Sequence, residues 1–184
     1  MQLYIPSNYR PISLTSVCCK ILEHIIYSGI SHHLEEHNVI CDEQHGFRSG
    51  RSCETQLLIT IHDFANNLNN QKQTDAILLD FTKAFDKVSH RRLCSKLFHY
   101  GIRGNLLSWI NDFLTDRTQR VLVDGCSSDD TLVTSAVPQS TVLAPLLFLI
   151  FINDLPENIA SSIKLNADTM MCSFTELWSL SVTT

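Results

Sequence analysis

Asp80 is the acidic residue best placed for chemistry in this sequence. It follows a short apolar run, residues 76–79, which is typical of a strand buried on both faces. A carboxylate at the end of such a strand is costly to remove from water, so it needs a backbone cap, a basic residue or a metal ion beside it. Taken alone, Asp80 is better explained by a strand that simply ends there.

Basic side chains gather in three groups, although 14 Lys and Arg against 19 Asp and Glu give a formal charge of −5. The groups are Arg48 and Arg51; Lys83, Lys87, Arg91, Arg92 and Lys96; and Arg117 and Arg120. Net acidity argues against a protein that binds nucleic acid over its whole surface, but it permits a local basic groove. The first group lies in a loop with Gly46 and Gly50, where guanidinium and backbone N–H groups could converge on a phosphate. Each group alone is better explained by a solvated helix face or loop.

The seven cysteines and eight histidines show no spacing that is typical of a metal site. The odd number of cysteines and the absence of a signal peptide at the start predict reduced thiols in an intracellular protein of the nucleus or cytoplasm. The longest apolar run, residues 142–152, is interrupted by Pro145 and is too short to cross a bilayer. No membrane association is therefore expected.

A chain of 184 residues with 44% hydrophobic composition supports one domain or two small subdomains. Apolar periodicity and capping residues predict a mixture of helices and strands. The expected helices are 17–37 with a possible break at Gly29, a helix capped by Ser52 that ends in the asparagines near 66–70, and helices at 90–99, 105–114 and 143–155. The expected strands are 76–79, 118–123 and 131–137 around a turn at Asp124-Gly125, and 162–165, with a turn at 166–169 leading into 170–172.

Six blocks of sequence, in this order, resemble the reverse transcriptase domain of non-LTR (LINE-like) retrotransposons of the jockey or CR1 type. The blocks are NYRPISL at 8–14, QHGFRSGRS at 44–52, LLDFTKAFDKV at 78–88, VPQSTVLAP at 137–145, FINDLP at 151–156 and KLNAD at 164–168. The resemblance covers nearly the whole chain. The order of the blocks distinguishes this family from a generic phosphotransferase with two carboxylates.

The resemblance implies an α+β fold with fingers and a palm, in which helices back a mostly antiparallel palm sheet. Residues 1–72 would form a helical fingers part with the Arg-rich loop, residues 73–172 the palm, and residues 173–184 a tail without pattern. It also implies an RNA-directed DNA polymerase, whose partners are an RNA template, a DNA primer and deoxynucleoside triphosphates. The thumb of the family is expected to be absent.

The same resemblance implies the metal ligands. Asp80 matches the family's first catalytic aspartate, Asp168 matches the first Asp of its turn motif, and the backbone carbonyl of Phe81 would be a neutral ligand. In the family, two Mg²⁺ ions about 4 Å apart stabilise the attacking and leaving oxygens of nucleotidyl transfer. The two aspartates are far apart in sequence, so the fold must bring them together.

Other positions carry over by motif. The implied nucleotide contacts are Arg48, Arg51, Phe85, Gln139 and Ser140. The implied nucleic-acid contacts are Lys83, Lys87, Arg91 and Arg92. Phe85 would exclude a 2′-OH from the sugar site, or it is a plain core residue. Asp86 is expected to be structural and to pair with a nearby base or cap.

Several departures from the family pattern predict impaired activity. Thr169 follows Asp168 where the family has a second Asp, either by substitution or by loss of one residue, so the second Mg²⁺ site is doubtful. Asn166 replaces the usual aromatic residue, and Ser140 and Ala144 each replace a Gly. We expect a degenerate fragment with little or no polymerase activity. The alternatives are a nucleic-acid-binding remnant without catalysis and a remnant that does not accumulate.

Overall fold

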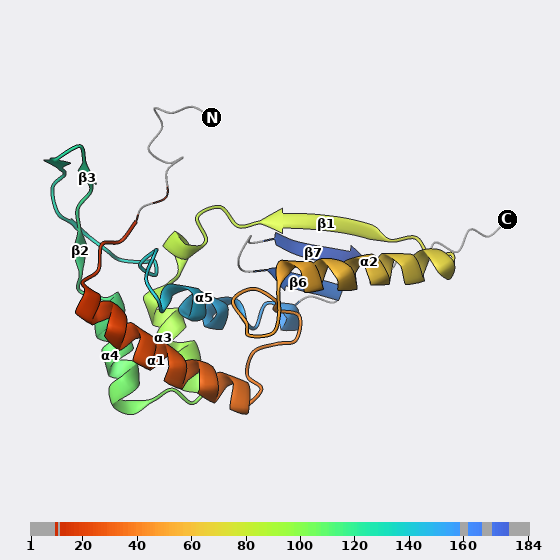
Figure 1. The fold of residues 1–184 in the computed structure, drawn as a ribbon, viewed down its shortest axis with the longest axis horizontal. Coiled ribbons are helices and arrows are strands. Elements are labelled where there is room, and N and C mark those ends of the chain that lie inside the picture. The colour runs from red at the N-terminus through yellow and green to blue at the C-terminus, as the bar shows by residue number, and fades with distance from the viewer. Residues whose placement is uncertain (1–9, 11, 159–161, 167–170, 177–184) are drawn as a thin grey trace.

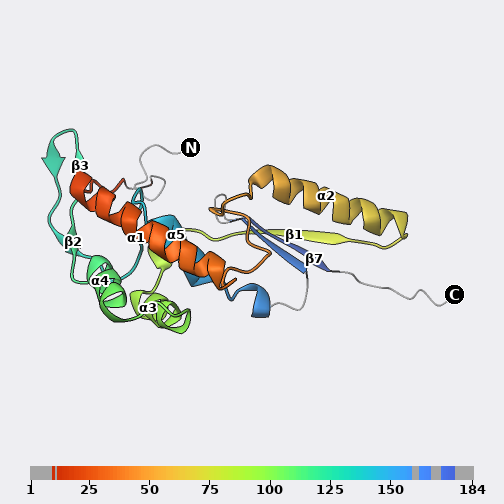
Figure 2. The same cartoon turned by 60° about the horizontal axis from the view of Figure 1, so that its bottom comes forward.

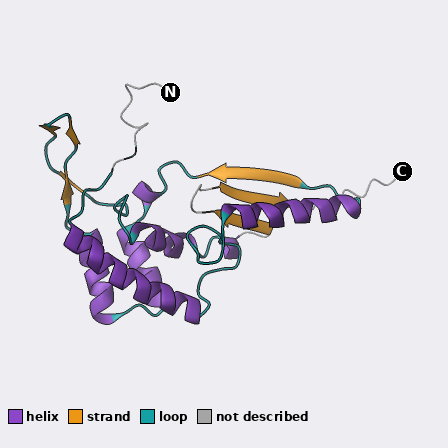
Figure 3. Ribbon diagram, in the orientation of Figure 1, coloured by secondary structure: helices purple, strands orange, loops and turns teal. Residues whose placement is uncertain are grey.

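The computed structural model describes residue 10 and residues 12–158, 162–166 and 171–176, and it contains both helices and short antiparallel strands (Figures 1 and 3). The helices are α1 (Val17–Glu36), α2 (Cys53–Asn69), α3 (His90–His99), α4 (Gly104–Leu114) and α5 (Ala144–Ile152), with the short 3₁₀ helices η2 (Phe85–Lys87) and η3 (Pro156–Asn158). The strands are β1 (Asp75–Asp80), β2 (Thr118–Gln119), β3 (Leu122–Val123), β4 (Cys126–Ser127), β5 (Thr131–Leu132), β6 (Ser162–Asn166) and β7 (Met171–Glu176). This content is compatible with the predicted α+β class.

Serines cap both long helices, and the cap at Ser52 is the one that the sequence predicts. The Ser16 side chain accepts a hydrogen bond from the Cys19 N–H at 3.2 Å at the start of α1. Ser52 and Thr55 form a reciprocal capping box at the start of α2. The possible break at Gly29 does not occur, because α1 is continuous to Glu36.

The hydrophobic core is centred on α5, whose sequence is almost wholly apolar. Residues Leu146 to Ile150 of this helix are all buried. Helices α3 and α4 pack together, and α3 also packs against α5. Leu93 and Leu97 from α3 and Ile110 and Leu114 from α4 are fully buried in the same cluster. A packed cluster of helices therefore supports α5.

The apolar faces that predict α1 and α2 are largely exposed. Val17 on α1 is 74% exposed and Leu68 on α2 is 76% exposed. The buried residues of α1 are instead Glu23, Ile30 and Leu34. The apolar periodicity of the sequence therefore predicts these two helices correctly. It does not predict which face of each helix packs against the rest of the described chain.

Strands β1, β7 and β6 form an antiparallel sheet in that order, and α2 lies alongside it (Figures 1 and 2). Strand β7 continues to Glu176, into the segment for which the sequence gives no pattern. Whether the helices and this sheet divide into fingers and palm stays a prediction. No helix in the described ranges is long and apolar enough to cross a membrane.

The turn at Asp124-Gly125 is confirmed, but the long strands predicted on either side of it are wrong. Only two-residue pairs form, β3 with β4 and β2 with β5. Both turn residues have positive φ, 49° and 79°, as a tight hairpin turn requires. The Val133 N–H still donates to the Arg117 carbonyl, but the N–H groups of Ala136 and Val137 bond to the carbonyls of Val88 and Phe85 instead. Tertiary hydrogen bonds therefore replace the expected strand pairing.

Candidate active site

Asp80 is the last residue of β1, and the sheet register relates it to the segment that contains Asp168. The Cα of Asp80 pairs with Met171, and Met171 pairs on its other side with Asn166. Asp80 is therefore level with the two residues that border segment 167–170. Asp168 and Thr169 belong to that segment and lie outside the described residues, so the convergence of the two carboxylates stays a prediction.

The donor set implied for this edge of the sheet suits a hard cation. Two carboxylates and the carbonyl of Phe81 supply only oxygen ligands, which Mg²⁺ prefers. The register is compatible with this set, because it places the end of β1 and the ends of the β6–β7 connection in one row. A Mg²⁺ ion held by this donor set stays a prediction.

Residues 138–143, the Gln139 loop, are joined to the segment that follows β1. The Gln139 side-chain amide donates to Asp86 Oδ1 at 2.8 Å, and the Val137 N–H donates to the Phe85 carbonyl at 3.1 Å. The structure thus brings Gln139 close to Phe85, two of the predicted nucleotide contacts. Asp86 has a structural partner, as expected, but this partner is an amide rather than a base or a cap.

The Phe85 ring is half-buried and stacks on Phe148 of α5, with ring centroids 4.6 Å apart. Phe148 is only 2% exposed and belongs to the core. This stacking is compatible with the simpler interpretation of Phe85 as a core residue. Its contact with a sugar ring stays a prediction.

Ser140 occupies a backbone conformation that favours glycine. Its φ is 63°, in the left-handed region, and its side chain is exposed. A non-glycine residue pays a steric cost of about 1–2 kcal/mol in this region. The glycine that Ser140 replaces in the family pattern therefore has a physical reason at this position.

We expect Ser140→Gly to raise the free energy of unfolding by about 0.5–1 kcal/mol, since relief of strain exceeds the added flexibility of the unfolded chain. Urea denaturation followed by circular dichroism measures this change. Ser49 is a suitable control, because it is also exposed and in a loop but is not among the residues with positive φ. Ser49→Gly should be neutral or destabilising, and an equal gain there would argue against strain at Ser140.

Arg48 and Arg51 hydrogen-bond within their own loop. Arg48 Nη1 donates to the Cys41 carbonyl at 2.8 Å, and Arg51 Nη2 forms a 2.7 Å ion pair with Asp42. Burial, reinforced by the charge of Arg51, lowers the pKa of Arg48, although a guanidinium stays charged at neutral pH. Asp42 is 90% exposed, and such surface pairs contribute little stability, so a phosphate could replace Asp42 as the partner of Arg51.

A cavity of about 680 Å³ opens beside Phe81, the residue after Asp80. Its walls come from the segment after β1, from α3 and from the end of α5; they include Phe81, Lys87, Arg92, Lys96, Phe151 and Asp154. Lys96 Nζ donates to the Phe151 carbonyl and to Asp154 Oδ1. Of the four predicted nucleic-acid contacts, Lys87 and Arg92 line this cavity, whereas Lys83 and Arg91 are exposed elsewhere.

Asn153, after the end of α5, has a role that the sequence motifs do not reveal. This buried side chain accepts from the Cys41 N–H at 2.9 Å and donates to the Val39 carbonyl at 2.7 Å. It therefore ties α5 to the segment that leads into the Arg48 and Arg51 loop. The one feature of the sequence that could have indicated this role is a polar residue directly after an apolar helical run.

Comparison with known proteins identifies the protein family to which this chain belongs. The family model for reverse transcriptase (RNA-dependent DNA polymerase) matches residues 4–176, so the chain belongs to this family. The match confirms the predicted reverse transcriptase family, and the relatives below confirm its non-LTR type.

Particular relatives are proteins of mobile elements. The chain is 33% identical over 157 residues to the probable RNA-directed DNA polymerase from transposon BS of Drosophila melanogaster, covering 82% of this chain and 17% of that protein. It is 32% identical over 153 residues to the RNA-directed DNA polymerase from mobile element jockey of Drosophila funebris, covering 83% of this chain and 17% of that protein. It is also 28% identical over 152 residues to a retrovirus-related Pol polyprotein from a type-1 retrotransposable element R2 of Popillia japonica, with coverages of 82% and 21%. The chain thus spans about a fifth or less of the length of these relatives.

Proposed function

We propose that this chain is the nucleotidyl-transfer part of an RNA-directed DNA polymerase, with synthesis weak or absent in the present sequence. The reaction joins the 3′-OH of a DNA primer to the α-phosphate of a deoxynucleoside triphosphate, directed by an RNA template, and releases pyrophosphate. Family membership supports this proposal, and so do the relatives described as RNA-directed DNA polymerases. The observation that carries it is the register of Asp80 with the ends of the β6–β7 connection.

The proposed roles follow from this placement. Asp80, Asp168 and the Phe81 carbonyl would hold Mg²⁺, which when bound stabilises charge on the attacking and leaving oxygens. Arg48 and Arg51 would bind the triphosphate through paired N–H donors. Phe85 and the Gln139 loop would contact the sugar and base of the nucleotide and so orient it.

Thr169 is the proposed main cause of weak activity, because a hydroxyl replaces a charged ligand. We expect Thr169→Asp to raise the rate of Mg²⁺-dependent single-nucleotide addition by roughly 10–100-fold, the scale on which metal-site groups act. The measurement is extension of a labelled DNA primer on an RNA template. If the turn lost one residue, insertion of an Asp after Asp168 should give this increase instead.

Two further variants make that assay decisive. Thr118→Asp adds the same charge at an exposed position in β2 and should leave the rate unchanged. Asp80→Asn in the Thr169→Asp background should abolish the gain. An increase that survives Asp80→Asn would contradict the proposed metal site.

A second candidate function is nucleic-acid binding without catalysis. Lys83, Lys87, Arg91 and Arg92 are all exposed and close together in sequence. This function predicts binding to a primer–template duplex that weakens steeply with salt and is unaffected by Asp80→Asn. Such binding, together with no nucleotide addition by any of the Asp variants, would favour the second candidate.

A further inference from the structure

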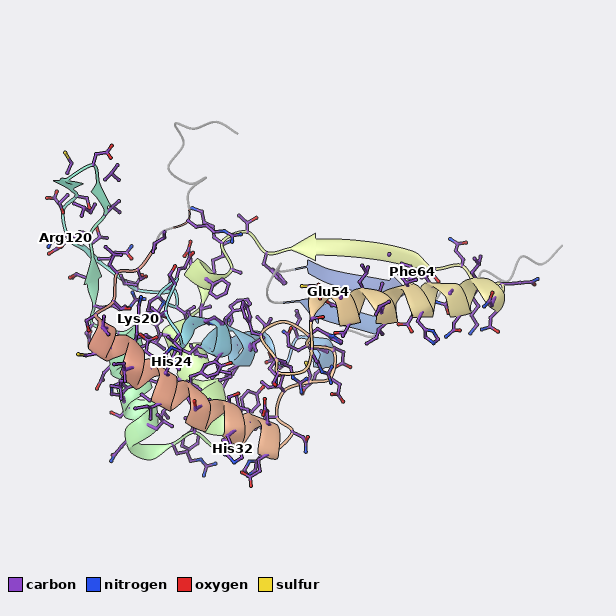
Figure 4. The ribbon with its side chains drawn as sticks, in the orientation of Figure 1. Lys20, His24, His32, Glu54, Phe64 and Arg120 are labelled. Carbon is purple, nitrogen blue, oxygen red and sulfur yellow. The ribbon has the colours of Figure 1, made fainter. Side chains whose placement is uncertain are left out.

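Glu23 is a buried acid in the middle of a largely exposed helix. It lies in α1 between Lys20 and His24 in the sequence, and the side chains of these two residues, labelled in Figure 4, are exposed. Glu23 itself is 0% exposed and shares the buried face of α1 with Ile30 and Leu34. A carboxyl group removed from water in this way needs hydrogen-bond donors.

The donors come from the start of another helix. Glu23 Oε2 accepts from the Val142 N–H at 2.8 Å and from the Leu143 N–H at 3.1 Å. Leu143 is the N-cap residue of α5 and makes no side-chain capping bond. Glu23 thus caps α5 from a different element, and an acidic side chain is favoured at this positive end of the helix dipole.

These two bonds fix one end of the Gln139 loop. The other end is held by the bonds from Val137 to Phe85 and from Gln139 to Asp86. Ser140, with its left-handed backbone, lies between the two anchors. Displacement of the loop would remove both donors from Glu23. Its other oxygen, Oε1, is buried without a hydrogen-bond partner among the described residues.

We propose that Glu23 is a positioning residue, which holds the Gln139 loop against α1 and so sets the place of the nucleotide contacts Gln139 and Ser140. The effect on nucleotide binding rests on the proposed function. The effect on the loop does not, because it follows from the two backbone bonds alone.

The first test is amide hydrogen exchange, read by NMR on the whole chain. Glu23→Gln keeps the shape of the side chain but removes its charge, so exchange at Val142 and Leu143 should become roughly tenfold faster or more. Exchange in α3 should change much less. Glu36→Gln is the matched control, because Glu36 lies on the same helix and its side chain is 63% exposed.

Unchanged exchange at Val142 and Leu143, or an equal acceleration throughout α3, would overturn the proposal. If Glu23→Gln does not fold, Glu23→Asp keeps the charge while withdrawing the oxygens from the loop. It should accelerate exchange at the same two amides, and wild-type exchange in this variant would also overturn the proposal.

The second test is binding of a deoxynucleoside triphosphate with Mg²⁺, measured by calorimetry. Glu23→Gln should raise the Kd roughly tenfold, whereas Glu36→Gln should leave it unchanged. Equal affinity of wild type and Glu23→Gln would overturn the positioning role. A wild-type chain that binds no nucleotide would instead overturn the proposed function, and the exchange measurement would then decide whether Glu23 holds the loop.

Discussion

Replacement of Leu147 by Ala is expected to lower the free energy of unfolding by about 2–5 kcal/mol, because it leaves a cavity in the core. Leu147 is 0% exposed and lies in α5, whose neighbours Leu93 and Leu97 on α3 are also fully buried. A domain of this kind has a total stability of about 5–15 kcal/mol, so this one change removes a large fraction of it. Urea denaturation followed by circular dichroism provides the measurement.

Leu68→Ala is the matched control for this prediction. It deletes the same atoms from α2, but Leu68 is 76% exposed, so its effect should stay within about 0.5 kcal/mol. Similar losses in the two variants would mean that α5 is not the centre of the core.

The stability of α5 matters for the site because both candidate substrate-binding loops are attached to it. The Gln139 loop leads directly into its first turn, where Glu23 binds the Val142 and Leu143 amides. Asn153 at its other end binds the segment before the Arg48 and Arg51 loop. Loosening of α5 would therefore disturb both loops at once.

Local signals in the sequence predict much of the secondary structure. Ser52 starts α2, the asparagines end it, and Asp124-Gly125 forms the expected turn. The strand expected over residues 131–137 fails because Ala136 and Val137 bond to a segment some fifty residues earlier, Phe85 to Val88. Contacts between distant parts of the chain cannot be deduced from local periodicity.

The residues of the candidate site likewise include some that the sequence predicts and some that it does not. Motif order points to Asp80, Gln139 and the Arg-rich loop. Hydrogen bonds join the Gln139 loop to the segment that follows β1, and the sheet register sets Asp80 level with the residues that border segment 167–170. Glu23 lies outside the six blocks, and the block that contains Asn153 assigns it no role, because a buried polar side chain is explained only by the backbone groups that it meets. Glu23 does share a helical face with Ile30 and Leu34, and a polar residue on an apolar face was the signal available.

Replacement of Asp80 by Asn is expected to weaken divalent-cation binding by roughly 10–100-fold or more, because it removes a formal charge from a site with two proposed carboxylate ligands. The amide oxygen of Asn still fits the ligand position, so the variant tests charge rather than shape. Asp168→Asn should have an effect of similar size, since both carboxylates are proposed to hold the same ion. If the losses of binding free energy in the two single variants add up in the double variant, the two residues would instead belong to separate sites.

The most direct test of the proposed polymerase site is Mn²⁺ binding, followed by electron paramagnetic resonance in wild type, Asp80→Asn, Asp168→Asn and Asp124→Asn. Asp124 lies in the exposed β3–β4 turn and serves as the control. We predict that wild type and Asp124→Asn bind the ion alike and that Asp80→Asn and Asp168→Asn each lose it. Equal binding by all four proteins would contradict a metal site shared by residues 80 and 168.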